Sequence, residues 1–127
     1  KHMDKEFKNY PDIAPVMGAY SRATKVGNTF YMAGCTAGDS TASLPDQVRV
    51  TLEKIKGVME AEGQSMADVV KLTTFVTDVL EWGANGDAIN GVFKAIFQGR
   101  YPPNTMIGCA ALALPSMKVE IEAIAMF

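Results

Sequence analysis

The chain has 127 residues, 48% hydrophobic and 20% charged, a size and composition typical of one compact globular domain. Its net charge is −2 and no block of lysine or arginine stands out, so we expect no nucleic acid partner and no membrane partner. Two cysteines, Cys35 and Cys109, and one histidine, His2, are too few for a disulfide framework or a common zinc site, and we expect no cofactor and no metal.

The distribution of apolar residues predicts neither a membrane-spanning helix nor a signal peptide. No segment approaches the roughly 20 apolar residues of a membrane-spanning helix, and the first residues lack the apolar stretch of a signal peptide, so we expect a cytoplasmic protein. The pair His2-Met3 is typical of a cloning remnant. We therefore interpret residues 1–3 as a tag remnant and residues 4–127 as a single domain.

The first predicted elements form a β-hairpin followed by a helix. Residues 20–25 and 29–33 are rich in strand-forming side chains and flank a turn at Gly27-Asn28, whereas residues 34–43 are small and polar and predict a loop. Pro45 is typical of a first helical turn. The helix is expected to end near Gly63 and to bury one stripe, formed by Val48, Leu52, Ile55 and Met59.

The second half of the chain predicts a strand, a helix and two final strands. Residues 69–78 alternate, and we expect Val70, Leu72, Thr74 and Val76 to share one face. Residues 82–98 predict a helix whose first turn is weakened by glycines, at about 1 kcal/mol each relative to alanine. Residues 104–112 and 119–127 predict the last two strands.

The order β-β-α-β-α-β-β predicts an α+β fold in which two helices cover only one face of the sheet. We expect the other face to expose apolar side chains, namely Ile124, Met126, Met106 and Leu112. Because a large exposed apolar surface needs cover, further copies of the chain are the expected partner.

Five separated segments carry a resemblance to a known family. They are Gly18-Ala19-Tyr20-Ser21-Arg22-Ala23, Tyr31-Met32-Ala33-Gly34, Asn90-Gly91-Val92-Phe93, Tyr101-Pro102-Pro103-Asn104-Thr105 and Val119-Glu120-Ile121-Glu122-Ala123-Ile124-Ala125. In this order and spacing, from about Pro15 to Phe127, the chain resembles the reactive intermediate deaminases of the YjgF/RidA family. The resemblance implies a chorismate-mutase-like domain, a homotrimer, and small-molecule ligands bound in clefts between subunits.

Asn104 stands where the resemblance implies an arginine that grips the substrate carboxylate. An asparagine amide carries no charge, so we expect a substrate that is uncharged or held differently. The alternative interpretation is an asparagine that hydrogen-bonds to the local backbone at the start of a strand.

Glu122 matches the second acid of the family's Glu-x-Glu pattern and is the predicted catalytic residue, which would place a water beside the imine carbon. Glu120 lies on the same side of that strand and is the alternative acid. A structural interpretation also stands, in which Glu122 forms an ion pair between subunits.

The remaining predicted ligand-binding residues are drawn from all five segments. Tyr20 would cover the ligand with its ring, and backbone N–H groups at Gly34 would bind an oxyanion. Asn90 matches a helix asparagine of the family, whereas Phe93 and Cys35 stand where a tyrosine and a glutamine are usual, and Met106 near Asn104 completes the predicted set. Packing explains Tyr20 and Phe93 as the alternative.

Three functions remain open from the sequence. The first is hydrolytic deamination of a small enamine or imine, which the resemblance implies. The second is a non-catalytic trimer that binds a small metabolite, which the missing arginine favours. The third, endoribonuclease and translation inhibitor, is the family's older label and ranks last, because it predicts a basic face that this acidic chain lacks.

Overall fold

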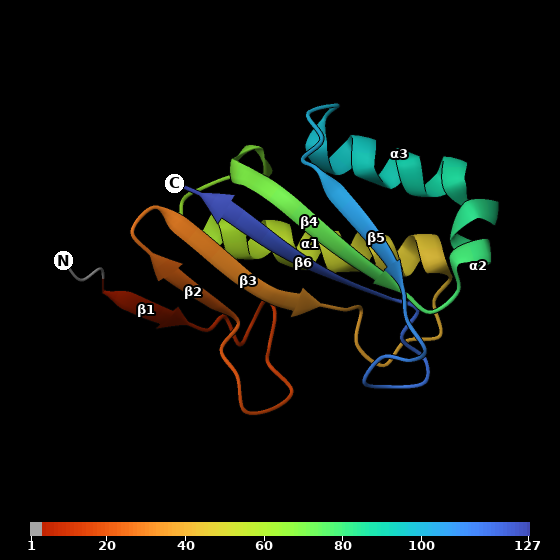
Figure 1. The fold of residues 1–127 in the computed structure, drawn as a ribbon, viewed down its shortest axis with the longest axis horizontal. Helices are drawn as coiled ribbons and strands as arrows, with labels where there is room; N and C mark the ends of the chain where they lie inside the picture. Colours follow the sequence, from red (N-terminus) through yellow and green to blue (C-terminus); the bar gives the residue numbers. More distant parts are fainter. Residues whose placement is uncertain (1–3) are drawn as a thin grey trace.

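The computed structural model describes residues 4–127, and the interpretation of residues 1–3 lies outside this range. The described residues form one domain of the predicted α+β class, with its helices on one face of a sheet that has six strands rather than five (Figure 1). In chain order the elements are β1 (Lys5–Lys8), β2 (Ala23–Val26), β3 (Thr29–Cys35), α1 (Leu44–Ala61), the 3-10 helix η1 (Met66–Asp68), β4 (Val69–Val76), α2 (Val79–Ala84), α3 (Gly86–Phe97), β5 (Asn104–Gly108) and β6 (Val119–Met126).

The strand order in the sheet is β1-β2-β3-β6-β4-β5. Only β4 and β5 are parallel, which follows from the helical connection between them. Helix α1 packs against β3 and β6, and α3 packs against α1, so the core lies between the helices and one face of the sheet.

Strand β1 is an addition that the sequence did not predict. It pairs antiparallel with β2, and its Phe7 is 68% exposed, so it has no buried face and no apolar alternation to reveal it. Its last residue is tied to the end of α1, because Lys8 Nζ lies 3.1 Å from a Glu62 carboxylate oxygen. The Tyr10 hydroxyl donates to the same carboxylate at 2.6 Å.

Helix α1 follows the predicted stripe closely. The four stripe residues are all fully buried: Val48, Leu52, Ile55 and Met59. Each such side chain contributes about 1.5–3 kcal/mol by leaving water. Ser43 caps the helix by accepting from the backbone N–H of Asp46, and Gly63 stands just beyond the end with φ +74°, a value that favours glycine.

Strand β4 differs from the predicted alternation at its first residues. Its pairing with β6 shifts register between Val69 and Lys71. Val69 is therefore buried, and Val70 is 41% exposed rather than sharing a face with Leu72 as predicted. The later residues Leu72, Thr74 and Val76 are buried on one face, as the period of two requires.

The second predicted helix is two helices. Asp78 caps α2 by accepting from the backbone N–H of Glu81, so the helix begins earlier than predicted. The chain bends at Asn85, between the glycines that weakened the sequence prediction, and α3 continues from Gly86. Helix α3 ends where Gln98 and Gly99 adopt left-handed conformations.

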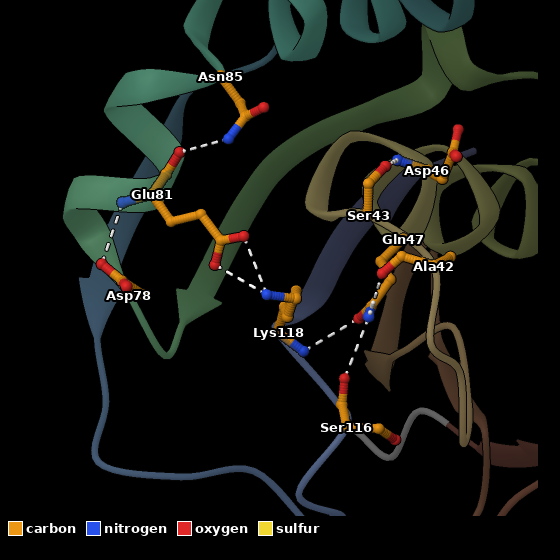
Figure 2. A network of polar contacts seen from close by, with 9 residues as sticks. All are labelled: Ala42, Ser43, Asp46, Gln47, Asp78, Glu81, Asn85, Ser116 and Lys118. Carbon is orange, nitrogen blue, oxygen red and sulfur yellow. Dashed lines mark hydrogen bonds and ion pairs between the residues drawn. The ribbon is translucent and has the colours of Figure 1, made fainter.

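A buried glutamine joins three segments that lie far apart in the sequence. Figure 2 shows Gln47 of α1 donating to the carbonyls of Ala42 and Ser116, both at 3.1 Å. Its side-chain oxygen accepts from the backbone N–H of Lys118 at 3.0 Å, and Lys118 Nζ pairs with Glu81 of α2 (Figure 2). Because Gln47 is fully buried, this network fixes the chain just before β6.

The face of the sheet away from the helices carries exposed apolar side chains, as expected. Tyr31 and Met126 are 51% and 44% exposed. The placement of Met106 on this face was wrong, because Met106 lies opposite the buried Thr74 and so points to the helix side. The strand itself also ends at Gly108, before Leu112.

Candidate functional site

The predicted site residues fall into three separate hollows of the domain. The first, the Arg22 pocket, has a volume of about 510 Å³ and is lined by Tyr20, Arg22, Gly34, Cys35, Lys54 and Glu120, among others. The second, the Asn104 pocket, has about 530 Å³ and is lined by Leu72, Trp82, Asn90, Phe93, Asn104 and Met106, with Tyr101 and Pro102. The third, the Glu122 groove, has about 350 Å³ and includes Tyr31, Lys71, Thr73 and Glu122.

Arg22 organises the pocket that bears its name. The side chain is only 4% exposed. Its guanidinium donates to the carbonyls of Ala14 at 3.0 Å, Pro15 at 2.8 Å and Gly34 at 2.7 Å. These bonds hold the loop before β2, which includes Tyr20, against the end of β3.

Sequence reasoning missed Arg22 as a structural centre. Its segment was recognised, but nothing in the spacing says that this arginine turns inward and bonds to the backbone of two other segments. Its guanidinium carbon also lies 5.7 Å from the Tyr20 ring centroid, within cation–π range.

Glu120 approaches Gly34 so closely that a side chain at position 34 would displace its carboxyl. A Cβ at position 34 would lie 2.7 Å from both Cγ and Cδ of Glu120, a distance that real side chains do not tolerate. The glycine therefore lets the Glu120 carboxyl lie directly over the backbone of β3, in the pocket that Tyr20 also lines. Of the two acids in the Glu-x-Glu pattern, Glu120 is the one that the fold brings to these predicted residues.

The environment of Glu120 also differs from that of an ordinary surface acid. Burial raises the pKa of its carboxyl, the nearby charge of Glu122 raises that pKa further, and Arg22 lowers it in part. Glu122 is exposed and lies in the Glu122 groove rather than with Tyr20 and Gly34. The predicted catalytic acid is therefore apart from most of its predicted partners within one chain.

Cys35 faces the Arg22 pocket as a buried thiol. Its sulfur lies 3.5 Å from Arg22 Nη1. Burial raises the pKa of the thiol, and the charges of Arg22 and Lys54 offset this only in part. A thiol held protonated in this way is a packing and contact group rather than a nucleophile.

The Asn104 pocket gathers four predicted residues: Asn90, Phe93, Asn104 and Met106. Asn104 begins β5 after two prolines, and its Oδ1 accepts from the Thr74 hydroxyl at 2.9 Å. The Trp82 and Phe93 rings meet edge to face with centroids 6.4 Å apart, which forms one apolar wall. Trp82 was not predicted as a site residue, because it lies outside the five segments that carry the family resemblance.

The sheet separates Asn104 from Glu120. Asn104 pairs in register with the fully buried Leu72, so its side chain points to the helix side. Glu120 alternates with the buried Val119 and Ile121, so it points to the uncovered face. A single chain therefore cannot present both side chains to one small ligand.

Comparisons with known proteins agree with this fold. A family model described as endoribonuclease L-PSP matches residues 12–127. A 2-iminobutanoate/2-iminopropanoate deaminase of Dermatophagoides farinae is 35% identical over 114 residues, covering 85% of each chain. The chain belongs to the YjgF/RidA (endoribonuclease L-PSP) family.

Two more relatives of this YjgF/RidA chain support the same family role. A deaminase of the same name from Rattus norvegicus is 30% identical over 115 residues, covering 86% of this chain and 80% of the relative. A crystal structure of RidA from an Antarctic Psychrobacter superposes with a TM-score of 0.80 at 34% identity, covering 95% and 98% of the two chains. The relatives named as imine deaminases thus share nearly the whole domain.

Two features are absent from the described part of this YjgF/RidA chain. Between residues 4 and 127 no helix is both long and apolar enough to cross a membrane. In the same range no three His, Cys, Asp or Glu side chains stand close enough together to hold a metal ion.

Proposed function

We propose that this YjgF/RidA protein hydrolyses a small reactive imine or enamine and releases ammonia. The observation that carries the proposal is the Glu120 carboxyl, which lies over Gly34 in the pocket that Tyr20 also lines, in a domain whose relatives are named as imine deaminases. Glu120, the alternative acid, takes the catalytic role predicted for Glu122, because Glu120 shares the Arg22 pocket with Gly34 and Tyr20.

The chemistry requires one acid–base group beside the imine carbon. Water adds to that carbon while the imine nitrogen takes up a proton, and the resulting carbinolamine breaks its C–N bond to give a carbonyl and ammonia. A carboxylate at the pocket wall can accept a proton from the attacking water and return it to the leaving nitrogen. Partial burial raises the pKa of Glu120 toward the range in which both steps are useful.

The site is completed by a second copy of the chain. Glu120 and Asn104 point to opposite faces of the sheet, and the uncovered face exposes Tyr31 and Met126. Packing that face on the β5 edge of a neighbour would hide its apolar area and join an Arg22 pocket to an Asn104 pocket. We propose a homotrimer with three such clefts, the assembly that the family resemblance implies.

In this cleft the two pockets have different roles. The Arg22 pocket supplies Glu120, the Tyr20 ring and the Gly34 backbone. The Asn104 pocket supplies the wall that holds the rest of the ligand, formed by Asn90, Phe93, Asn104 and Met106.

A direct assay tests the proposed activity. Imines are generated in situ by oxidases acting on amino acids and on primary amines, and ammonia is followed continuously with a coupled dehydrogenase. Free imine hydrolyses slowly, so ammonia lags behind the hydrogen peroxide that the oxidase forms. We expect catalytic amounts of the protein to shorten this lag for at least one imine; no shortening across the panel would contradict the proposal.

A non-catalytic ligand-binding trimer is the second candidate, and Asn104 favours it, because an uncharged amide replaces the cation that the resemblance implies. An Asn104→Arg variant separates the two functions. A gain of deaminase activity toward carboxylate-bearing imines would mean that the rest of the catalytic site is in place. Binding without turnover in both forms would favour the second candidate.

A further inference from the structure

The Asn104 pocket has a lining that fits one class of ligand. Its eight lining residues include no acidic or basic side chain. Six of them are apolar or aromatic: Leu72, Trp82, Phe93, Tyr101, Pro102 and Met106. The Phe93 ring also stacks on Phe97 at 6.0 Å, and Phe97 is buried, so this wall is held rigidly from behind.

Besides the Tyr101 hydroxyl and the Trp82 indole N–H, the polar groups of this pocket are two neutral amides, those of Asn104 and Asn90. The Thr74 hydroxyl, itself fully buried, donates to Asn104 Oδ1 at 2.9 Å and so fixes the amide plane. This leaves the N–H groups of Asn104 to donate to a ligand, while Asn90 lies exposed at the same pocket. Two neutral amides match a carbonyl or an imine nitrogen, but they do not repay the desolvation of a carboxylate.

The Arg22 pocket, which the proposed cleft joins to the Asn104 pocket, offers little favourable interaction to a ligand carboxylate. The guanidinium of Arg22 already donates to backbone carbonyls through Nε, Nη1 and Nη2. The carboxyl of Glu120 is at the same wall, with Glu122 close enough to raise its pKa. A second anion placed there would be repelled by both acids.

Lys54 is the other cation that lines the Arg22 pocket, and its ammonium group would attract a ligand carboxylate. Its Nζ donates to the Thr36 carbonyl at 2.8 Å, which engages it with the backbone directly after β3. It retains further donor capacity, so the experiment includes a variant of it.

We infer that the site takes uncharged imines or enamines whose reacting carbon carries an aromatic or branched apolar group and no carboxylate. The imine hydrolysis in this inference rests on the proposed function, whereas the preference for an uncharged ligand rests on the lining of the two pockets. The reaction is R–CH=NH plus water giving R–CHO plus ammonia. The water oxygen bonds to carbon, the C–N bond breaks, both water protons end on nitrogen, and no oxidant or reductant is needed.

Binding is tested first with two stable molecules of the same shape. Phenylacetamide and phenylacetate differ by a neutral amide against a carboxylate. We expect the full-length protein to bind phenylacetamide at least tenfold more tightly by calorimetry. Asn104→Arg should reverse that order, whereas Ala88→Arg, which adds the same charge at an exposed position of α3 outside the pocket, should leave it unchanged.

Turnover is tested with a matched pair of imines. An amine oxidase makes 2-phenylethanimine from 2-phenylethylamine, and an amino acid oxidase makes 2-imino-3-phenylpropanoate from phenylalanine. We expect kcat/KM to be at least tenfold higher for the neutral imine. Both imines carry the same benzyl group, and they differ at the reacting carbon by a hydrogen against a carboxylate.

The outcomes separate the inference from the proposed function. Tighter binding of phenylacetamide with no turnover of either imine supports the ligand class and contradicts the hydrolase. Preferred binding and turnover of the carboxylate forms overturns the inference and leaves the hydrolase standing. If Lys54→Met then removes that preference, Lys54 is the anion anchor and the inference is still overturned.

Discussion

Replacement of Glu120 by glutamine should lower kcat/KM for imine hydrolysis by about 100-fold or more, the usual contribution of a positioned acid–base group. Glutamine keeps the shape of the side chain over Gly34, but its amide cannot accept the proton of the attacking water. The measurement is the ammonia-release assay at matched protein concentration, with the oligomeric state checked by size-exclusion chromatography. A variant that stays within threefold of the unmodified protein would contradict the assignment.

Glu122→Gln is the matched control, two residues away on the same strand. Because Glu122 is exposed and lies outside the Arg22 pocket, we expect its kcat/KM to change by less than about threefold. Loss of activity in Glu122→Gln with retention in Glu120→Gln would restore the assignment made from the sequence.

The same control variant has a second readout in the pH profile. The charge of Glu122 raises the pKa of Glu120, so its removal lowers that pKa. If Glu120 works as the carboxylate, activity is lost as the pH falls through its pKa. The acid limb of Glu122→Gln should therefore lie at lower pH than that of the unmodified protein, and an unmoved limb would indicate another titrating group.

Arg22→Met should lower the free energy of unfolding by about 3 kcal/mol. The substitution leaves the carbonyls of Ala14, Pro15 and Gly34 without their donor, and hydrogen bonds to a charged group contribute about 1.5–3 kcal/mol each before water partly replaces them. Urea unfolding gives the difference, measured at one protein concentration because assembly shifts apparent stability.

Arg49→Met removes the same charge from an exposed position and serves as the comparison. Arg49 pairs with Glu53 at 2.9 Å on the outer surface of α1. Exposed pairs of this kind contribute about 0–1 kcal/mol, so the midpoint should scarcely move. Equal losses in the two variants would mean that the buried bonds of Arg22 contribute no more than a surface ion pair.

The sequence predicted those elements whose two faces differ. Helix α1 has one apolar stripe and one charged face, and β6 alternates buried and exposed residues, so the period of each is visible in one dimension. Strand β1 has no buried face and was missed. The bulge at Val70 was also missed, because the residue types of the segment do not reveal it. The extra residue of the bulge turns the Val70 side chain to the other face.

The candidate site was predictable as a set of residues but not as an arrangement. Family segments identified Tyr20, Gly34, Asn90 and Asn104, yet which of them lie together depends on strand pairing. The choice between Glu120 and Glu122 depends on which acid lies over Gly34 in another strand, and it is Glu120 whose carboxyl occupies the space that a Cβ would fill. The inward turn of Arg22 likewise depends on carbonyls from segments distant in the sequence.

Complementation between two inactive variants measures most directly whether the site is shared. Glu120→Gln disables the Arg22 pocket, and Asn104→Trp fills the Asn104 pocket from an exposed position. After the two are unfolded together and refolded, random assembly gives each cleft about a one-in-four chance of two intact halves. Recovery of roughly a quarter of the original activity is the expected result; hybrid oligomers detected by mass spectrometry with no recovered activity would contradict a site built from two copies.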